Sequence, residues 1–276
     1  MLRKLLKYDM QSIWKIFLFL AGTVLLLSPL GGLAIRFMIQ NESETLILLS
    51  VFSGFFLFIN VMAIMAFSVI IAIMLYVRFY KNFFTDEGYL TFTLPVKRST
   101  LLASKTINAV IWMLATLVVC ILCVLEIILI AIPRELWETL PPNFWEMLQI
   151  RFSAWWLLYV PLVIFAILAV LWCSVSIFQF CITTGAVIAK RYKLLAAIGI
   201  YYLFNMVSSF VAQIFTIMGT IALEGMLSTT VPTLTDGEGK LLGAAIVLAV
   251  GAIAASLACL LHYLTLGHLE RRLNLA

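Results

Sequence analysis

Charged residues are scarce in this chain. Asp, Glu, Lys and Arg together make up 11% of its 276 residues, whereas an ordinary soluble domain has about 25% charged residues. Apolar residues make up 64%, and they form runs of about 20 residues or more that leave little sequence for a soluble domain. The composition therefore excludes a conventional soluble protein and predicts an integral membrane protein.

Signatures of catalysis, nucleotide binding and metal binding are also missing. The chain has two histidines, and neither belongs to an HExxH motif or a three-ligand zinc pattern. The segment Gly237-Glu238-Gly239-Lys240 resembles a phosphate loop, but Leu234 stands at the first glycine position and Leu241 where Ser or Thr is needed. We therefore expect no enzyme activity and no cofactor or metal on this chain.

The five cysteines do not form a recognisable framework. Cys120 and Cys123 have the spacing of a redox pair, but both lie in an apolar run, where cysteine usually behaves as a small hydrophobic residue. We interpret both as packing residues, with a redox or metal role as the alternative.

Six apolar runs are long enough to span a membrane as helices. They cover residues 16–39, 46–77, 101–132, 155–189, 194–223 and 241–266. The cluster Lys190-Arg191-Tyr192-Lys193 must separate the fourth run from the fifth, because burying its three charges in a membrane helix would cost roughly 8 to 10 kcal/mol. We therefore predict an all-α polytopic membrane protein, with six transmembrane helices in a single domain, residues 1–276.

Basic residues concentrate on one side of this arrangement. Fourteen of the 18 lie at the two ends of the chain, between the second and third runs, or between the fourth and fifth. They are Arg3, Lys4, Lys7, Lys15, Arg78, Lys81, Lys97, Arg98, Lys105, Lys190, Arg191, Lys193, Arg271 and Arg272. The positive-inside rule places these regions, and hence both termini, in the cytoplasm. The net charge of +5 therefore indicates orientation in a membrane rather than nucleic-acid binding.

Residues 1–15 combine apolar and basic residues at helical spacing. Leu6, Met10 and Ile13 fall on one face, and the basic residues lie largely on the other. This pattern predicts an amphipathic helix lying on the inner leaflet, and a basic flank that only orients the first span is the alternative. Asp9 interrupts the apolar face, and the sequence offers no reason for it.

The second run is longer than a membrane needs. As a helix it would measure about 48 Å against a hydrocarbon core of about 30 Å, and tilt alone would have to reach about 50° to absorb the excess. We therefore expect its end to enter the cytoplasm and to carry the polar segment 78–99, RFYKNFFTDEGYLTFTLPVKRS. Thr85 and Pro95 suit the start and end of a short helix in this segment. The helix could anchor the loop or dock a partner protein, and the residues alone favour neither.

Polar residues inside the spans are costly in lipid and therefore informative. Asn60 and Glu126 are isolated polar residues in the second and third runs, and Glu126 lies close enough to the end of its run to reach the outer interface. The fifth run carries a polar stripe at spacings of three and four residues: Asn205, Ser208, Ser209, Gln213, Thr216 and Thr220. All these residues could line a translocation path or hydrogen-bond to neighbouring helices.

The segment RFYKNFFTDEGYLTFTLPVKRSTLLASK, residues 78–105, together with the opening MLRKLLKYDMQ, resembles bacterial ABC transporter permeases of the type-2 exporter class, especially those of Gram-positive bacteria. The six-span topology extends the resemblance to the whole chain. The resemblance implies an amino-terminal connecting helix on the inner leaflet and a coupling helix, between the second and third spans, that docks on an ATPase subunit. Carried over to this sequence, the docking contacts are Asp86, Glu87, Gly88, Tyr89, Leu90, Phe92 and Leu94.

The resemblance also implies an assembly. Two permeases, identical or paralogous, would pair with two ABC ATPase subunits, which would bind the ATP and magnesium and hydrolyse the ATP. The expected function is the permease subunit of an ATP-driven exporter in the cell membrane, because the short outer loops disfavour import. A membrane scaffold or channel without an ATPase is the alternative, and the missing catalytic constellations disfavour an intramembrane enzyme. Residues 224–235 could form a short version of the family's re-entrant helices.

Overall fold

The computed structural model is all-helical in the parts of the chain that it describes, residues 2–40, 47–85, 88, 93, 96–132, 156–189, 192–230 and 236–271. The long helices are, in order, α1 (Leu2–Gln40), α2 (Ile47–Phe84), α4 (Arg98–Ala131), α7 (Trp156–Ile188), α8 (Lys193–Thr230) and α9 (Asp236–Arg271). All six are long and apolar enough to cross a membrane, which confirms the six predicted spans. A helix suits such runs because it satisfies all its backbone polar groups internally, as lipid requires.

Large apolar side chains cover much of the outer surface of these helices. Phe19, Leu26 and Leu157, for example, are 72%, 80% and 86% exposed. A soluble protein rarely exposes contiguous apolar surface on this scale, whereas lipid tails are a suitable environment for it. The surface therefore agrees with the apolar lengths of the helices in indicating a multi-pass membrane protein.

The chain divides into two compact units, each described by itself. The first comprises Met1–Arg78 and Ala103–Ser153, and it contains α1, nearly all of α2 and most of α4. The second comprises Phe79–Leu102 and Ala154–Ala276, and it contains α7, α8 and α9. The segment that leads from α2 to α4 thus belongs to the same unit as the three carboxy-terminal helices.

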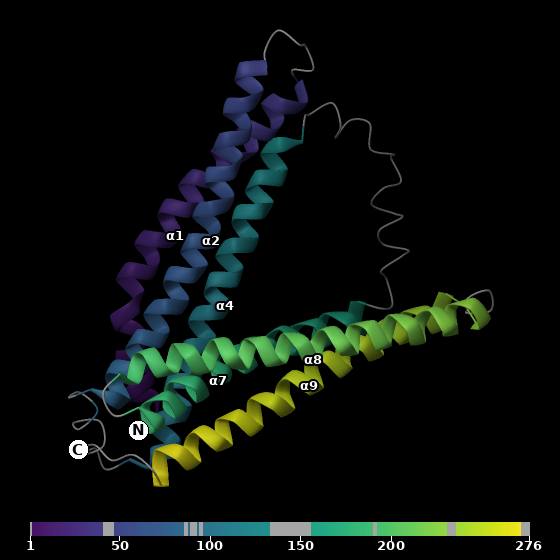
Figure 1. Ribbon diagram of the computed structural model, residues 1–276. Coiled ribbons are helices and arrows are strands. Elements are labelled where there is room, and N and C mark those ends of the chain that lie inside the picture. Colours follow the sequence, from purple (N-terminus) through teal and green to yellow (C-terminus); the bar gives the residue numbers. More distant parts are fainter. Residues whose placement is uncertain are drawn as a thin grey trace. The chain divides into compact units, whose positions relative to one another are not determined.

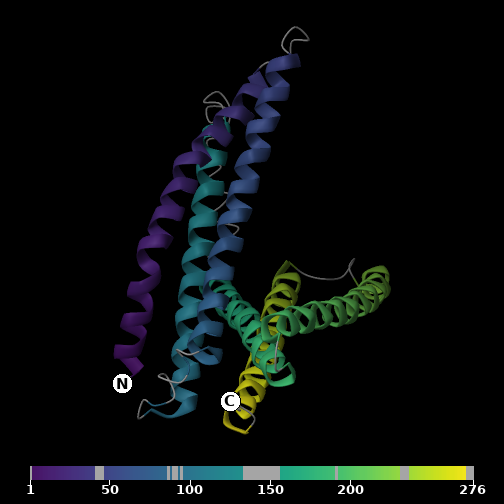
Figure 2. The ribbon, with the colours of Figure 1, turned by 60° about the vertical axis from the view of Figure 1, so that its left-hand side comes forward.

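In the first unit, α1, α2 and α4 run side by side (Figures 1 and 2). Phe17 of α1 joins the three helices, because its ring packs against Phe67 of α2 and Trp112 of α4, at centroid distances of 5.9 and 4.7 Å. All three side chains are buried. The centre of this unit is therefore an aromatic contact, of the kind that adds to the stabilisation from burial alone.

Two consecutive glycines let the neighbours of α1 come close to its backbone. A Cβ atom on Gly31 would lie 2.9 Å from Cγ of Asn60 in α2. A Cβ atom on Gly32 would lie 2.7 Å from Cβ of Ile130 in α4. Small residues commonly mark such close contacts between membrane helices, and here they set the packing of α1 on both partners.

In the second unit, α7 packs against both α8 and α9. The side chains of Tyr159 and Phe165 in α7 lie over Gly243 and Gly251 in α9, where a Cβ atom would come within 2.9 and 2.8 Å of them. Because the two contacts follow the same chain order in both helices, α7 and α9 run parallel.

The predicted break between the fourth and fifth spans is confirmed. α7 ends at Ile188 and α8 begins at Lys193, on either side of the basic cluster. Close to this break, a Cβ atom on Gly185 would lie 2.5 Å from the backbone nitrogen of Ala197. α7 and α8 therefore form a tight helical hairpin.

Two helices continue further than the sequence suggested. α1 runs from Leu2 to Gln40 without a break, so residues 2–15 are continuous with the first span. No proline or glycine occurs before Gly22 to interrupt it. α8 likewise continues to Thr230, so residues 224–230 extend α8 instead of starting a re-entrant helix, and residues 231–235 lie outside the described part.

Candidate functional site

The docking residues expected from the sequence lie mostly outside the described residues. Only Gly88 is described among Asp86, Glu87, Gly88, Tyr89, Leu90, Phe92 and Leu94. Gly88 is helical and buried, its N–H donates to the carbonyl of Thr85 at 2.7 Å, and a Cβ atom on it would lie 2.7 Å from the carbonyl oxygen of Phe83. Gly88 therefore allows a tight turn after α2, and the docking role of all seven residues stays a prediction.

Thr85 closes α2 with its side chain. Its hydroxyl donates to the carbonyl of Lys81 at 2.6 Å, one of the last carbonyls of α2, which lack partners within the helix. The hydroxyl thus points back into α2, although the sequence suggested that it caps the next helix. The backbone carbonyl of Thr85, which accepts a hydrogen bond from the N–H of Gly88, forms the turn that follows α2.

Three phenylalanines cluster at the end of α2, in the part of the helix that belongs to the second unit. The ring of Phe79 lies 5.0 Å from that of Phe83 and 6.3 Å from that of Phe84, measured between centroids. All three are buried, Phe83 completely. α2 extends as a helix to Phe84, as its length predicted, and its last turns carry this cluster of buried rings.

Arg98 links the start of α4 to the end of α9. Its Nη1 atom donates to the carbonyls of Leu269 and Glu270, at 2.6 and 3.3 Å. The last carbonyls of a helix lack intrahelical partners and carry the negative end of the helix dipole, so a guanidinium group is favourable there. No local sequence pattern marks this contact, because Arg98 and Leu269 are 171 positions apart.

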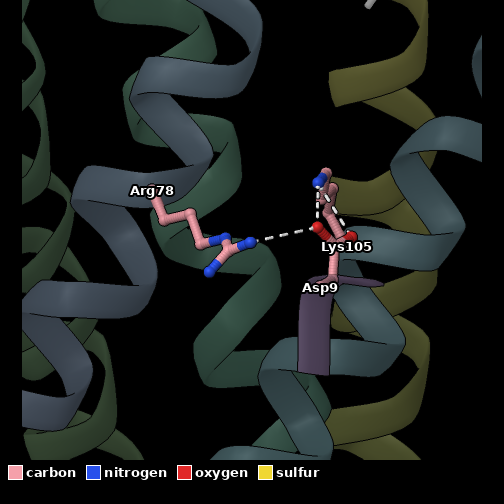
Figure 3. Close-up of polar contacts among 3 residues, drawn as sticks. All are labelled: Asp9, Arg78 and Lys105. Carbon is pink, nitrogen blue, oxygen red and sulfur yellow. Dashed lines mark hydrogen bonds and ion pairs between the residues drawn. The ribbon is translucent and has the colours of Figure 1, made fainter. Parts of the chain in front are cut away.

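A charged cluster joins the three helices of the first unit: Asp9 of α1, Arg78 of α2 and Lys105 of α4 (Figure 3). Lys105 Nζ donates to both carboxylate oxygens of Asp9, at 2.7 and 2.8 Å, and Arg78 Nη2 lies 3.5 Å from Oδ1. Asp9 is 7% exposed, and a buried charge is expensive unless it is paired. The cluster explains the acid that interrupts an apolar face, since Ile13 and Phe17, the next buried residues of that face, pack against the unit's interior.

A second polar layer joins the same helices near their other end. Ser28 of α1 hydrogen-bonds to Glu126 of α4, and Nδ2 of Asn60 in α2 donates to the carbonyl of Leu27 in α1 at 2.7 Å. Asn60 is 2% exposed. The structure therefore gives Asn60 and Glu126, which were candidates for a translocation path, contacts that hold helices together.

The two polar layers lie about one hydrocarbon thickness apart. Measured along the helices at about 1.5 Å per residue, their separation is about 28 Å in α1, about 27 Å in α2 and about 32 Å in α4. These lengths run from Asp9 to Ser28, from Asn60 to Arg78, and from Lys105 to Glu126. Because the hydrocarbon core of a bilayer is about 30 Å thick, the layers suit the two edges of the membrane.

The polar stripe of α8 has a different environment. Asn205, Ser208 and Ser209 donate to carbonyls of their own helix, at 3.0, 3.1 and 3.0 Å. These side chains and that of Gln213 are exposed, and the side chain of Thr216 lies outside the described part. The stripe is therefore a polar face on the surface of the second unit, in contrast to Asn60.

Comparison with models of known protein families, with characterised proteins and with solved structures finds no match. Within the described parts of the chain, no three His, Cys, Asp or Glu side chains gather where they could hold a metal ion. Cys123 is buried and Cys120 is partly buried, both as free thiols, which is the environment of packing residues.

Proposed function

We propose that this chain is the permease subunit of an ATP-driven ABC exporter, with ATP and magnesium bound by a separate ATPase subunit. The resemblance of residues 78–105 and of the amino terminus to type-2 exporter permeases supports the proposal, as do the six apolar helices. The observation that carries it is that the segment Phe79–Leu102 forms one compact unit with α7, α8 and α9. A loop built into the helical body in this way suits the transfer of movement from a docked partner.

Two connections lead from this loop into the helices. α2 enters the loop as a continuous helix, and its last turns carry the buried rings of Phe79, Phe83 and Phe84. At the other end of the loop, Arg98 binds the terminal carbonyls of α9. When ATP draws the ATPase subunits together, a coupling helix in this loop would displace both α2 and α9, because packed helices move as rigid elements.

In this proposal the chain lies in the cell membrane with both termini in the cytoplasm, and residues 2–15, the first turns of α1, meet the inner leaflet. A second permease copy or a paralogue packs beside it. The polar stripe of Asn205, Ser208, Ser209, Gln213 and Thr216 would line the export path, whereas Asn60 and Glu126 stabilise the first unit.

The proposal is tested by co-expressing the chain with an ABC ATPase encoded beside its gene and purifying the chain from the membrane. We expect the ATPase to co-purify, and we expect Glu87→Lys to abolish its retention without reducing the amount of chain in the membrane, because the charge is reversed at a predicted docking contact. Asp236→Lys makes the same change on the proposed outer side and should leave retention intact. If the wild-type chain retains no ATPase, a scaffold or channel without an ATPase is favoured instead. If Glu87→Lys retains the ATPase normally, Glu87 is not a docking contact.

A further inference from the structure

The charged cluster of Asp9, Arg78 and Lys105 has an excess of positive charge, because two cations share one carboxylate. Lys105 Nζ lies 2.7 and 2.8 Å from the two oxygens of Asp9, so it engages the whole carboxylate. Arg78 reaches only Oδ1, at 3.5 Å. Its guanidinium group has several other N–H donors, and 27% of its side chain is exposed. Arg78 is therefore able to bind a second anion.

The surroundings add to this surplus of positive charge. Among the described residues of the first unit, the acids are Asp9 and Glu126, and Glu126 belongs to the other polar layer, about 30 Å away along the helices. Lys7, two residues before Asp9 on α1, is exposed. An anion that approaches Arg78 therefore meets further positive charge from the first unit.

The depth of the cluster matches that of lipid phosphates. The spacing of the two polar layers places Asp9, Arg78 and Lys105 at the edge of the hydrocarbon core. Tyr8 and Trp14, on α1 near Asp9, are 71% and 56% exposed, and such aromatic side chains favour the headgroup region. The forked donors of arginine fit phosphate oxygens, and the cytoplasmic leaflet, which this end of the helices is predicted to meet, is rich in anionic lipid.

We propose that Arg78 binds the phosphate of an acidic phospholipid in the inner leaflet, while Asp9 holds Lys105 and moderates the positive charge beside it. The bound lipid would fix the height of α2 in the membrane, at the turn where this helix leaves the lipid. The inference rests on the proposed orientation of the chain and not on an ATPase. Its test uses the chain alone, so its failure is distinguishable from failure of the proposed function.

The experiment measures lipid retained by the purified full-length chain. The chain is titrated in detergent micelles with phosphatidylglycerol or phosphatidylcholine, and bound lipid is counted by native mass spectrometry. We expect a preference for phosphatidylglycerol, a loss of about ten-fold in its affinity in Arg78→Gln, and a gain of several-fold in Asp9→Asn, which releases both cations. Arg36→Gln removes an equivalent charge near the other end of α1 and should leave the affinity for phosphatidylglycerol unchanged.

Three results would overturn the proposal. The first is equal retention of the two lipids. The second is an unchanged phosphatidylglycerol affinity in both Arg78→Gln and Asp9→Asn. The third is displacement of the lipid by glycerol phosphate at equal concentration, which would make the site one for a soluble phosphate. If Arg78→Gln does not fold, Arg78→Lys replaces it, and we expect an intermediate affinity because the charge remains and the fork is lost.

Discussion

Lys105 Nζ lies 2.7 Å from one carboxylate oxygen of Asp9 and 2.8 Å from the other, although the two residues are 96 positions apart. The contact joins α1 to α4 with little exposure, since 14% of the Lys105 side chain and 10% of the Asp9 side chain are accessible. A pair with this geometry stabilises a structure chiefly by keeping each charge from being left alone. Removing either residue therefore takes the partner that the buried charge of the other needs.

We therefore expect Asp9→Ala and Lys105→Ala each to lower the free energy of unfolding by about 3 kcal/mol, the lower end of the range for breaking a buried pair. The double variant should lose less than the sum of the two, because it removes both charges together. Denaturant unfolding in detergent measures all three variants. Strictly additive losses would show that the pair contributes no coupling.

Arg98 gives a second prediction, concerning the end of α9. Arg98→Ala should lower stability by about 1 kcal/mol, because it removes hydrogen bonds to the carbonyls of Leu269 and Glu270. Hydrogen exchange in the last turn of α9 should become faster. Lys97→Ala changes the neighbouring exposed basic residue and should leave the exchange at α9 as it is. Equal effects of the two substitutions would mean that Arg98 does not cap α9.

The glycines of α1 give a third prediction with an internal control. Gly32→Ala places a Cβ atom 2.7 Å from Cβ of Ile130 and 2.9 Å from the carbonyl oxygen of Ile127, so α1 and α4 must move apart. We expect a loss of about 1 to 3 kcal/mol. Gly22→Ala, on the same helix, meets nothing within 4 Å and should be neutral or slightly stabilising. Thermal unfolding of the two variants in detergent measures both effects. Unchanged stability of Gly32→Ala would count against the close contact between α1 and α4.

The hairpin of α7 and α8 gives a fourth prediction. In Gly185→Ala the new Cβ atom would lie 2.5 Å from the backbone nitrogen and 2.6 Å from Cα of Ala197, and backbone atoms cannot rotate away. We expect the hairpin to open, with a loss of about 1 to 3 kcal/mol and faster proteolytic cleavage near residues 189–192. Gly199→Ala, which meets nothing within 4 Å, is the matched control and should be cleaved at the wild-type rate.

Local patterns predicted the helices well. The six spans and the break between α7 and α8 follow from the length of each apolar run and from the cost of burying basic residues, and the structure has all of them. The same kind of reasoning suggested a separate helix over residues 1–15, but α1 passes through this region without a break. Amphipathic spacing shows which face of a helix is apolar but not where the helix ends, so it could not predict that α1 continues past residue 15.

The candidate site was harder to predict, because its contacts join distant parts of the chain. Asp9 interrupted an apolar pattern without explanation until the structure placed Lys105 and Arg78 beside it. Asn60 and Glu126 stood out as polar residues in apolar runs, but their partners, Leu27 and Ser28, carry no sequence signal. A polar residue inside a span indicates that it needs a hydrogen-bonding partner, but it does not indicate which residue the partner is.

The sequence by itself determined that this chain forms six helices of membrane-spanning length, because apolarity and helical hydrogen bonding are local properties of each segment. Only the tertiary structure decided which helices share a unit, that the loop after α2 is built into the unit of α7, α8 and α9, and that a carboxylate pairs with two cations at one end of α1. Those features depend on contacts between side chains that are far apart in the sequence. Such contacts follow from packing and charge pairing in three dimensions, and the sequence of a single segment does not determine them.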